Sequence, residues 1–557
     1  MPWLDLRRWP ADKFREALTG QVVRLSTSHG KELHDTVLDV AELYLSQMML
    51  DEAESVLGSM AGEASATSHR FVALRDALEL LRGRAISEKA SRSPLIDASR
   101  PDRDLWLTLD AVARGDAVAL YRHAKGAFRA LTYQSRPVAR GLLPVLAEAA
   151  VELQLESVDA EAITLLEALG DPRSLGAARY LSGRRAELVG NEKTAVENYL
   201  LAADGMDIYA TRARVALADM ALKNGSRGAL LAALDVLDEG VGNWRGDEYE
   251  LAMLERLAEV DLELHRPEEA LVAGGKILAR FPRTPASQKA RNWTSKTLED
   301  LAAKGLDGEL SLGEWVAVRR RLMPYFWSEP AFAHFSEQLG DAALKRGGTV
   351  LAVSEYQRVL AILEFQLASG SDDFDPQGID VVRYKLATAL LQSGKAEEAA
   401  EILKELKPVK GTPLAWKAMK LQAHVMAELG RTQELLEASV PKAGPEELRL
   451  MARARFDMED WSGATRLYRK IWASFPEEFG PDDATYLMLS AYRMGDMETA
   501  SRIADIFPKI ARDTGISDLV REFLAQPEPI EPLTRRSASS RLERTDRALR
   551  LLGKSGL

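Results

Sequence analysis

Apolar and small residues recur at helical spacing along most of the chain, in short runs that end at turn residues. Residues 178–188, ARYLSGRRAEL, place such residues three and four positions apart and lead to Gly190. After this glycine, Ala195, Tyr199 and Ala202 fall on one face of a second helix. Glycine ends a helix at little cost because it adopts a positive φ. Neither helix is apolar all round, so the pattern predicts a helical hairpin that buries its apolar stripe against neighbouring hairpins.

The hairpin pattern repeats along the chain. A turn residue is followed five positions later by alanine or leucine, as in Gly394 and Ala399 or Gly115 and Leu120. Some units are weaker, and their turns are interpolated near Gly83, Ser157 and Gly305. The turns, spaced about 37 residues apart on average, are expected near Met48, Gly83, Gly115, Ser157, Gly190, Gly225, His265, Gly305, Gly347, Gly394, Gly430, Glu459 and Gly495.

These hairpins resemble tetratricopeptide repeats, whose pattern has Leu-Gly in the first helix, alanine and an aromatic residue in the second, and a closing proline. The residues that match are Leu339, Gly340, Gly347, Ala352 and Tyr356 in one unit, Ala464, Tyr468, Phe475 and Pro476 in another, Ala270, Phe281 and Pro282 in a third, and Gly183, Ala195, Tyr199 and Ala202 without the proline. The resemblance covers roughly residues 36–510. It implies an all-α fold, a right-handed α-solenoid of about 12–13 hairpins. We expect this array over residues 36–525, with a possible irregular junction near 305–335.

A looser resemblance links long, alanine-rich arrays of this kind to large bacterial cell-envelope proteins, including periplasmic parts of flagellar or secretion machinery. The loop Asn243–Asp247 before a helix is typical of their linkers.

The two ends of the chain differ from its middle. Residues 1–35 are expected to form a short lead-in, and the proline-rich run QPEPIEP predicts a stiff linker over residues 526–536. Residues 537–557 are expected to form one basic helix, with Leu542, Leu549 and Leu552 on one face and Arg541, Arg544, Arg547 and Arg550 elsewhere. This helix would either cap the array or dock on a partner or an acidic surface.

Composition narrows the class of protein. The chain has 84 acidic and 73 basic residues, and this acidic balance argues against broad nucleic-acid binding. Cysteine is absent, which excludes disulfides, thiolate zinc sites and cysteine nucleophiles. No apolar run is long enough to span a membrane. The first residues, MPWLDLRRWPADKF, are charged and do not read as a signal peptide, so a periplasmic location would require a leader upstream and a cytoplasmic one would not.

The sequence contains only incomplete versions of motifs for catalysis or cofactor binding. Gly553-Lys554-Ser555 has alanine, not glycine, five places earlier, and residues 240–246 have one residue too many for a dinucleotide fingerprint. The seven histidines are scattered, without a zinc-ligand spacing on one helix face. Carboxylate pairs such as Glu397-Glu398 open second helices, where negative charge favours the helix dipole. We therefore expect no enzyme activity, catalytic residue, cofactor or metal site.

Two local features leave alternatives open. The loop at Asp373 and Asp375 begins like a calcium loop, but Tyr384 stands where the closing glutamate belongs, so a solvated capping loop competes with a calcium site. Residues 315–335 are rich in aromatic side chains, which would either pack in the core of an irregular junction or form an exposed contact patch. Pro324 and Pro330 are expected to break the helices there.

In tetratricopeptide repeats the first helix of each hairpin lines the concave face. Counting back from each turn places these candidate partner-binding residues on that face: Tyr180, Arg184, Arg212, Glu255, Glu259, Tyr384, Lys417, Lys420 and Tyr492. Family members that clamp a terminal carboxylate resemble each other in an asparagine at the ninth position of this helix. That position here holds Arg184, Asp219, Glu259, Asp341 and Thr388, so carboxylate clamping is not expected.

The sequence therefore predicts a scaffold that binds protein partners, within a large assembly or singly, without nucleic acid and without a membrane span. A structural or assembly component of a bacterial envelope machine, such as a flagellar motor, is the favoured interpretation. The alternative is a soluble cytoplasmic adaptor that binds peptides or helices in its groove.

Overall fold

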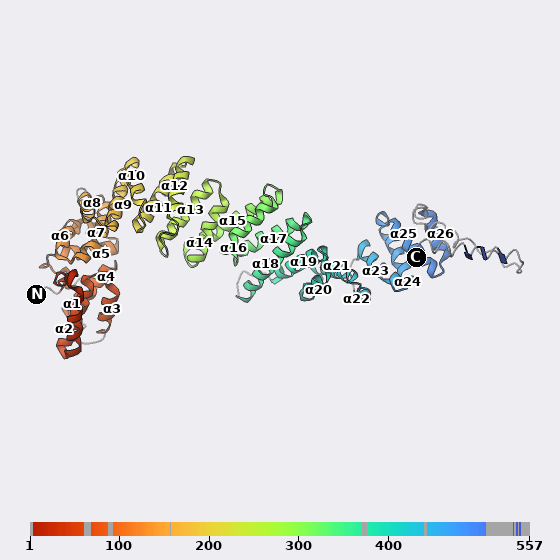
Figure 1. Ribbon diagram of the computed structural model, residues 1–557, viewed down its shortest axis with the longest axis horizontal. Helices are drawn as coiled ribbons and strands as arrows, with labels where there is room; N and C mark the ends of the chain where they lie inside the picture. Colours follow the sequence, from red (N-terminus) through yellow and green to blue (C-terminus); the bar gives the residue numbers. More distant parts are fainter. Residues whose placement is uncertain are drawn as a thin grey trace. The chain divides into compact units, whose positions relative to one another are not determined.

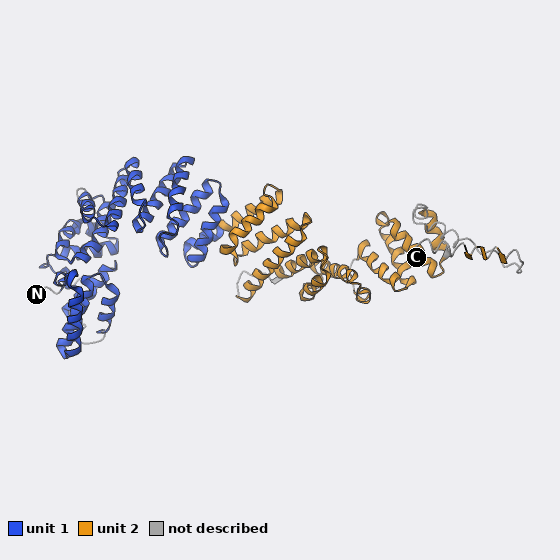
Figure 2. Cartoon of the chain, viewed as in Figure 1, with its two compact units in different colours: residues 1–292 blue, residues 293–557 orange. Residues whose placement is uncertain are grey.

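The computed structural model contains 26 α-helices and several short 3-10 helices in the part of the chain that it describes (Figure 1). The described residues are 4–60, 68–86, 93–155, 158–369, 376–438, 440 and 443–507, with six more between 538 and 546. They form two compact units, residues 1–292 and 293–557 (Figure 2). The predicted all-α repeat fold is confirmed. The linker expected at 526–536 and most of the helix expected at 537–557 lie outside the described residues.

Unit 1 consists of helices that pack mainly against the next helix in the chain. They are α1 (Phe14–Thr27), α2 (Gly30–Ser46), α3 (Leu50–Gly58), α4 (His69–Leu81), α5 (Arg103–Arg114), α6 (Ala117–Ala130), α7 (Arg136–Glu152), α8 (Val158–Leu169), α9 (Pro172–Leu188), α10 (Glu192–Ala203), α11 (Ile208–Asn224), α12 (Arg227–Gly240), α13 (Glu248–Glu263) and α14 (Pro267–Arg280). The boundary between the units falls within α15 (Pro285–Asp307).

Unit 2 continues the pattern of consecutive packing. Its helices are α16 (Leu312–Phe326), α17 (Pro330–Lys345), α18 (Thr349–Ala368), α19 (Pro376–Gln392), α20 (Ala396–Glu405), α21 (Pro413–Glu428), α22 (Thr432–Glu437), α23 (Pro445–Asp457), α24 (Trp461–Ser474), α25 (Pro481–Arg493) and α26 (Met497–Ile506). The prediction that Pro324 breaks a helix is wrong, because this proline lies inside the last turn of α16. Pro330 does begin a new helix, as the first residue of α17.

Eleven of the thirteen predicted turns lie at the predicted residue. The predicted residues with a positive φ are Met48, Gly83, Gly115, Gly190, Gly225, His265, Gly347, Gly394, Gly430, Glu459 and Gly495. The two other turns are displaced by three residues, to Gln154 and Gly308, whereas Ser157 lies outside the described residues. Gly83 follows α4, and the next helix among the described residues is the short 3-10 helix Pro94–Ile96.

A glycine and a tyrosine bring the two helices of a hairpin close together. A Cβ atom on Gly183 in α9 would lie 2.6 Å from the ring of Tyr199 in α10, and one on Gly340 in α17 would lie 2.7 Å from the ring of Tyr356 in α18. Each tyrosine hydroxyl donates a 2.7 Å hydrogen bond to a carboxylate of the first helix, Glu187 or Asp341. The Leu-Gly and tyrosine positions of the repeat pattern are therefore one packing unit.

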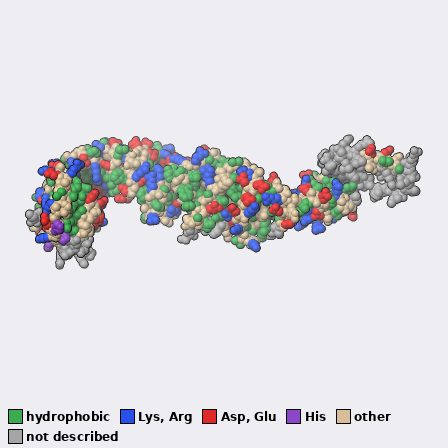
Figure 3. Space-filling model, turned by 60° about the horizontal axis from the view of Figure 1, so that its bottom comes forward, with side chains coloured by type: hydrophobic (Ala, Val, Ile, Leu, Met, Phe, Trp, Pro, Cys, Tyr) green, Lys and Arg blue, Asp and Glu red, His purple; other side chains and the backbone are tan. Residues whose placement is uncertain are grey.

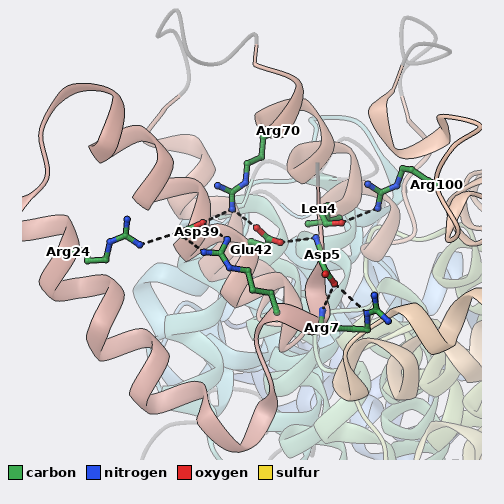
Figure 4. Close-up of polar contacts among 9 residues, drawn as sticks. Leu4, Asp5, Arg7, Arg24, Asp39, Glu42, Arg70 and Arg100 are labelled. Atoms are coloured by element: carbon green, nitrogen blue, oxygen red, sulfur yellow. Dashed lines mark hydrogen bonds and ion pairs between the residues drawn. The ribbon is translucent and has the colours of Figure 1, made fainter. Parts of the chain in front are cut away.

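The amino-terminal segment is packed into unit 1. Leu4, Leu6 and Trp9 are buried, and the backbone N–H of Asp5 donates a 2.9 Å hydrogen bond to Glu42 in α2. Carboxylates of α2 lie at the centre of an arginine network in which Arg70 of α4 contacts both Asp39 and Glu42 (Figure 4). Further contacts to Asp39 come from Arg8, at 3.0 Å, and from Arg24.

Candidate protein-binding surfaces

The first helices of consecutive hairpins form one face of unit 1, which we call the first-helix face. It consists of α7, α9, α11 and α13, each of which contacts the next in this series. Charged side chains pair across these contacts. Arg184 of α9 donates a 2.7 Å bond to Glu152 of α7, and Arg256 of α13 binds Asp219 of α11. These cations therefore hold neighbouring hairpins together.

Arg212 of α11 is surrounded by aromatic rings on this face. Its guanidinium carbon lies 4.5 Å from the ring centroid of Tyr180 and 5.5 Å from that of Tyr249. It also donates a 2.9 Å hydrogen bond to Glu148 of α7, so it reaches across α9. Tyr180 lies buried beneath this bridge, and burial raises its pKa. Burial likewise raises the pKa of Tyr209, the next aromatic neighbour, to about 12.

The other predicted residues of unit 1 are more open. Glu259 is exposed and accepts a 3.2 Å hydrogen bond from Arg256, and Glu255 is half-buried on the same helix. The structure thus places Tyr180, Arg184 and Arg212 close together on α9 and α11, with Tyr180 buried and the two arginines partly exposed. The two glutamates lie on α13, beside α11.

In unit 2, the predicted Tyr384 of α19 lines a shallow depression of about 370 Å³. Lys385, its neighbour, lies 2.6 Å from both Glu337 and Asp341 of α17. Asp341, at the ninth position of its helix, thus forms an ion pair with Lys385 and accepts a hydrogen bond from the hydroxyl of Tyr356. Thr388, at the equivalent position of α19, donates a 2.8 Å hydrogen bond to the carbonyl of Tyr384.

The remaining predicted residues lie on helices nearer the carboxyl end. Lys420 of α21 lies 3.1 Å from Glu447 of α23, and Lys417 on the same helix is exposed. Tyr492 of α25 is half-buried. On the face drawn in Figure 3, basic and acidic side chains of the described residues are interspersed along both units.

Residues 315–335 pack as the core alternative predicts. Trp315, Phe326, Phe332 and Phe335 are buried, and the ring centroids of Trp315 and Phe335 lie 5.6 Å apart. Trp327 differs: it is 47% exposed and lies against Phe365 of α18.

A second group of aromatic residues lies at the surface of α23, α24 and α25, and we call it the carboxy-terminal aromatic cluster. Phe456 makes edge-to-face contacts at 5.0 Å with both Trp461 and Tyr486, and all three side chains are half-buried. Arg453 lies 4.1 Å above the ring of Tyr486, and Arg493 lies 5.7 Å from that of Trp461. The sequence analysis missed this cluster, although Phe456 and Trp461 flank the predicted turn at Glu459.

An apolar groove runs between the second helices α10 and α12, and we call it the second-helix groove. It has a volume of about 760 Å³, and its lining includes Val196 and Leu200 from α10, Met220 from α11 and Val236 from α12. Its signal in the sequence is a set of small residues on one side of α12: Ala229, Ala232 and Ala233.

The described residues contain neither a cluster of metal ligands nor a membrane-spanning helix. Over that part of the chain, no group of three or more histidines, aspartates or glutamates is arranged to hold a metal ion. Asp373 and Asp375 lie outside the described residues, so the calcium alternative stays a prediction. None of the helices described is both long and apolar enough to cross a membrane.

Comparisons with known proteins add no family. No family model and no curated protein matches the chain. Among solved structures, a complex of Naa15 and Naa10 bound to HypK-THB is similar over 98% of this chain and 78% of its own, with 14% identity and a TM-score of 0.24. A circular tandem repeat protein with novel repeat topology is similar over 94% and 96%, with 15% identity and a TM-score of 0.13. Such low TM-scores carry no functional argument. The helices themselves define the chain as an all-helical repeat scaffold.

Proposed function

We propose that this chain is a non-catalytic scaffold that binds other proteins, with the carboxy-terminal aromatic cluster as a principal contact. The cluster carries the proposal because it combines tryptophan, tyrosine and arginine at the surface. These are the residue types that dominate binding energy at protein interfaces. Met458 and Met494 lie exposed near the two flanking turns and add flexible apolar area of the kind enriched at interfaces.

Within each unit, the open parts of the first helices offer further contacts. Lys417 and Glu259 are exposed there, and Arg184, Glu255, Lys420, Tyr384 and Tyr492 are partly so. Tyr180 and Arg212 contribute differently, because Arg212 covers Tyr180 and joins α7 to α11. The resemblance to tetratricopeptide repeats supports binding along first helices.

The setting of the scaffold stays a prediction. A component of a bacterial envelope machine such as a flagellar motor is the favoured interpretation, and a cytoplasmic adaptor is its alternative. Fractionation of cells that express the tagged native protein separates the two, since periplasmic and cytoplasmic pools are collected apart.

In-cell crosslinking followed by mass spectrometry tests the binding proposal. The full-length tagged chain is compared with the Trp461→Ala and Arg453→Ala variants. Loss of a hot-spot side chain costs about 2 kcal/mol or more, which corresponds to about 30-fold weaker binding. We expect both variants to recover much less of at least one discrete partner.

Trp327→Ala is the matched control, because Trp327 is also a surface tryptophan in contact with an aromatic ring. It should leave recovery unchanged. Arg453→Ala guards against a folding artefact, because its exposed side chain lies over the cluster and not beneath it. Equal recovery from all variants, or no discrete partner for the native chain, would contradict the proposal.

A further inference from the structure

We infer that the second-helix groove binds a basic amphipathic α-helix of a partner protein. This inference goes beyond the proposed function, because it concerns different helices, a different surface and a defined partner chemistry. It rests on the shape, lining and charge of the groove between α10 and α12.

The groove has walls and a floor from three consecutive helices. Val196 and Leu200 of α10 form one wall, and Ala233 and Val236 of α12 form the other. Leu217 and Met220 of α11 lie between them as the floor. Leu200 is 44% exposed, whereas Leu217 is buried, so apolar surface continues from the core out to solvent. Such surface is stabilised when a partner covers it.

Small residues keep the groove open. Ala229, Ala232 and Ala233 line it from α12, at positions three and four apart on one side of that helix. Larger side chains there would fill the space between the two second helices. Because Ala232 is exposed, its small size is not required for packing of the core.

The groove is elongated along both helices. It begins near the turn residue Gly190 and near Asn224, the last residue of α11, and a second depression of about 510 Å³ continues it to Asp204 and Glu239. The two hollows share Glu197, Leu200 and Val236. A length set by the 12 residues of α10 corresponds to about 18 Å, or about three helical turns. An amphipathic helix that offers leucines every three or four residues matches this apolar stripe.

The rim selects the charge of the occupant. Acidic residues around the two hollows are Glu187, Glu192, Glu197, Asp204, Asp219 and Glu239, against Lys193 and Lys223. Glu187 and Asp219 already bind Arg184 and Arg256, and Glu197 lies 4.0 Å from Lys193. Glu197 and the other three acidic residues are exposed. Arginine or lysine beside the apolar stripe of a partner would be attracted to this rim. The same charges disfavour an anionic membrane surface.

A free synthetic peptide of residues 537–557 serves as the probe, because its sequence combines leucines at helical spacing with four arginines. Its binding to the full-length chain is measured by fluorescence anisotropy at low and high salt. The chain is also measured with Arg541, Arg544, Arg547 and Arg550 all replaced by glutamate, so that its own segment cannot compete. We expect saturable binding that weakens with salt.

Matched variants locate the site. Leu200→Asp places a charge in the groove, and Ala232→Trp fills it; each should weaken binding at least about tenfold. Leu231→Asp is the control, because Leu231 is 42% exposed on the same helix but does not line the groove. Glu197→Lys should reduce the salt dependence, whereas Asp235→Lys, outside the lining, should leave it unchanged.

The outcomes separate this inference from the proposed function. No saturable binding, or binding that Leu200→Asp and Ala232→Trp leave unchanged, overturns the inference. Stronger binding of a peptide with glutamate in place of arginine overturns it too. None of these results affects partner recovery through the carboxy-terminal aromatic cluster. Conversely, if crosslinking of the native chain recovers no partner, the peptide-binding measurement on the second-helix groove is still valid.

Discussion

Gly183 and Gly340 show how single residues set the spacing of paired helices. Each is followed sixteen positions later by a tyrosine whose ring occupies the place that a Cβ atom would need. Because the tyrosine hydroxyl also binds a carboxylate of the first helix, the ring cannot move aside without losing that hydrogen bond. A methyl group at either glycine therefore forces the two helices apart.

We predict that Gly183→Ala destabilises the chain by about 1–3 kcal/mol, because overpacking of a close helix contact costs this much. Gly20→Ala is the control: Gly20 lies inside α1 with no atom within 4 Å of an added Cβ. Alanine should stabilise that helix by about 0.5–1 kcal/mol. Urea unfolding of both variants provides the test, and equal shifts in one direction would contradict the packing argument.

Tyr209 predicts how stability falls in alkali. Burial raises its pKa to about 12 in the folded chain, above the value of about 10 in an unfolded chain. The unfolded state therefore loses its proton first, and the contribution of Tyr209 to stability is complete below pH 10. It declines by about 1.4 kcal/mol per pH unit as the pH rises from 10 towards 12.

Replacement of Tyr209 by phenylalanine should therefore flatten the loss of stability between pH 9 and 11.5. Tyr121→Phe, at an exposed tyrosine of α6, serves as the comparison and should leave the slope unchanged. Thermal unfolding midpoints across this range provide the measurement. An unchanged slope in the Tyr209→Phe variant would refute the assignment.

Glycine also shows where sequence reasoning reached its limit. The turns could be predicted because a helix end followed by a small residue has a local signature, and even His265 and Glu459 adopt the expected positive φ. The turn predicted at Gly305 was wrong. This glycine lies inside α15, where the ring of Trp315 takes the space of a Cβ atom, and the turn falls at Gly308. A glycine for close packing and a glycine for a turn look alike in sequence.

At the scale of helices, arginines form ion pairs between neighbouring hairpins. Pairs such as Arg184 with Glu152 join residues of different hairpins, about one repeat apart. The sequence predicts Arg184 and Arg212 on the first-helix face as contacts for a partner, whereas in the structure they pair with Glu152 and Glu148. The pairing could not be predicted, because it depends on the rotation of each helix against the next. The second-helix groove escaped prediction for the same reason.

Arg70 tests the weight of a buried ion pair between helices. Arg70→Ala leaves the buried carboxylate of Glu42 without this cation, whereas the buried Asp39 keeps Arg8 and Arg24. Because a buried carboxylate that loses its cation is strongly destabilising, we expect a loss of about 3–5 kcal/mol of stability. Hydrogen exchange at the amide of Asp5 should also accelerate, since that amide is bound to Glu42.

Arg82 provides the comparison for Arg70. It follows α4 and binds the carboxylates of Asp51 and Glu54, which are exposed in α3. Exposed ion pairs contribute about 0–1 kcal/mol, so Arg82→Ala should be nearly neutral. Similar losses in the two variants would show that burial of the carboxylates is not what matters.

At the scale of the whole molecule, most helices contact only their near neighbours in the chain. Stability in such arrays is close to a sum of local terms. We therefore predict that Gly340→Ala accelerates hydrogen exchange in α16–α19 while α23–α25 and unit 1 stay protected. Exchange mass spectrometry of the full chain measures this, and a uniform acceleration along the chain would contradict it.

The bridge from Arg212 to Glu148 is an exception to nearest-neighbour packing, because it passes over α9. Because of this bridge, we expect the array to resist extension more strongly between α7 and α11 than elsewhere. A helical repeat chain under tension lengthens as the faces between hairpins open, much as a spring uncoils. Between α7 and α11 that opening must first break a charge-assisted hydrogen bond and withdraw a guanidinium from the tyrosine ring beneath it. Under a pulling force, the helices from α7 to α11 should therefore separate at a higher force than hairpins that lack such a bridge.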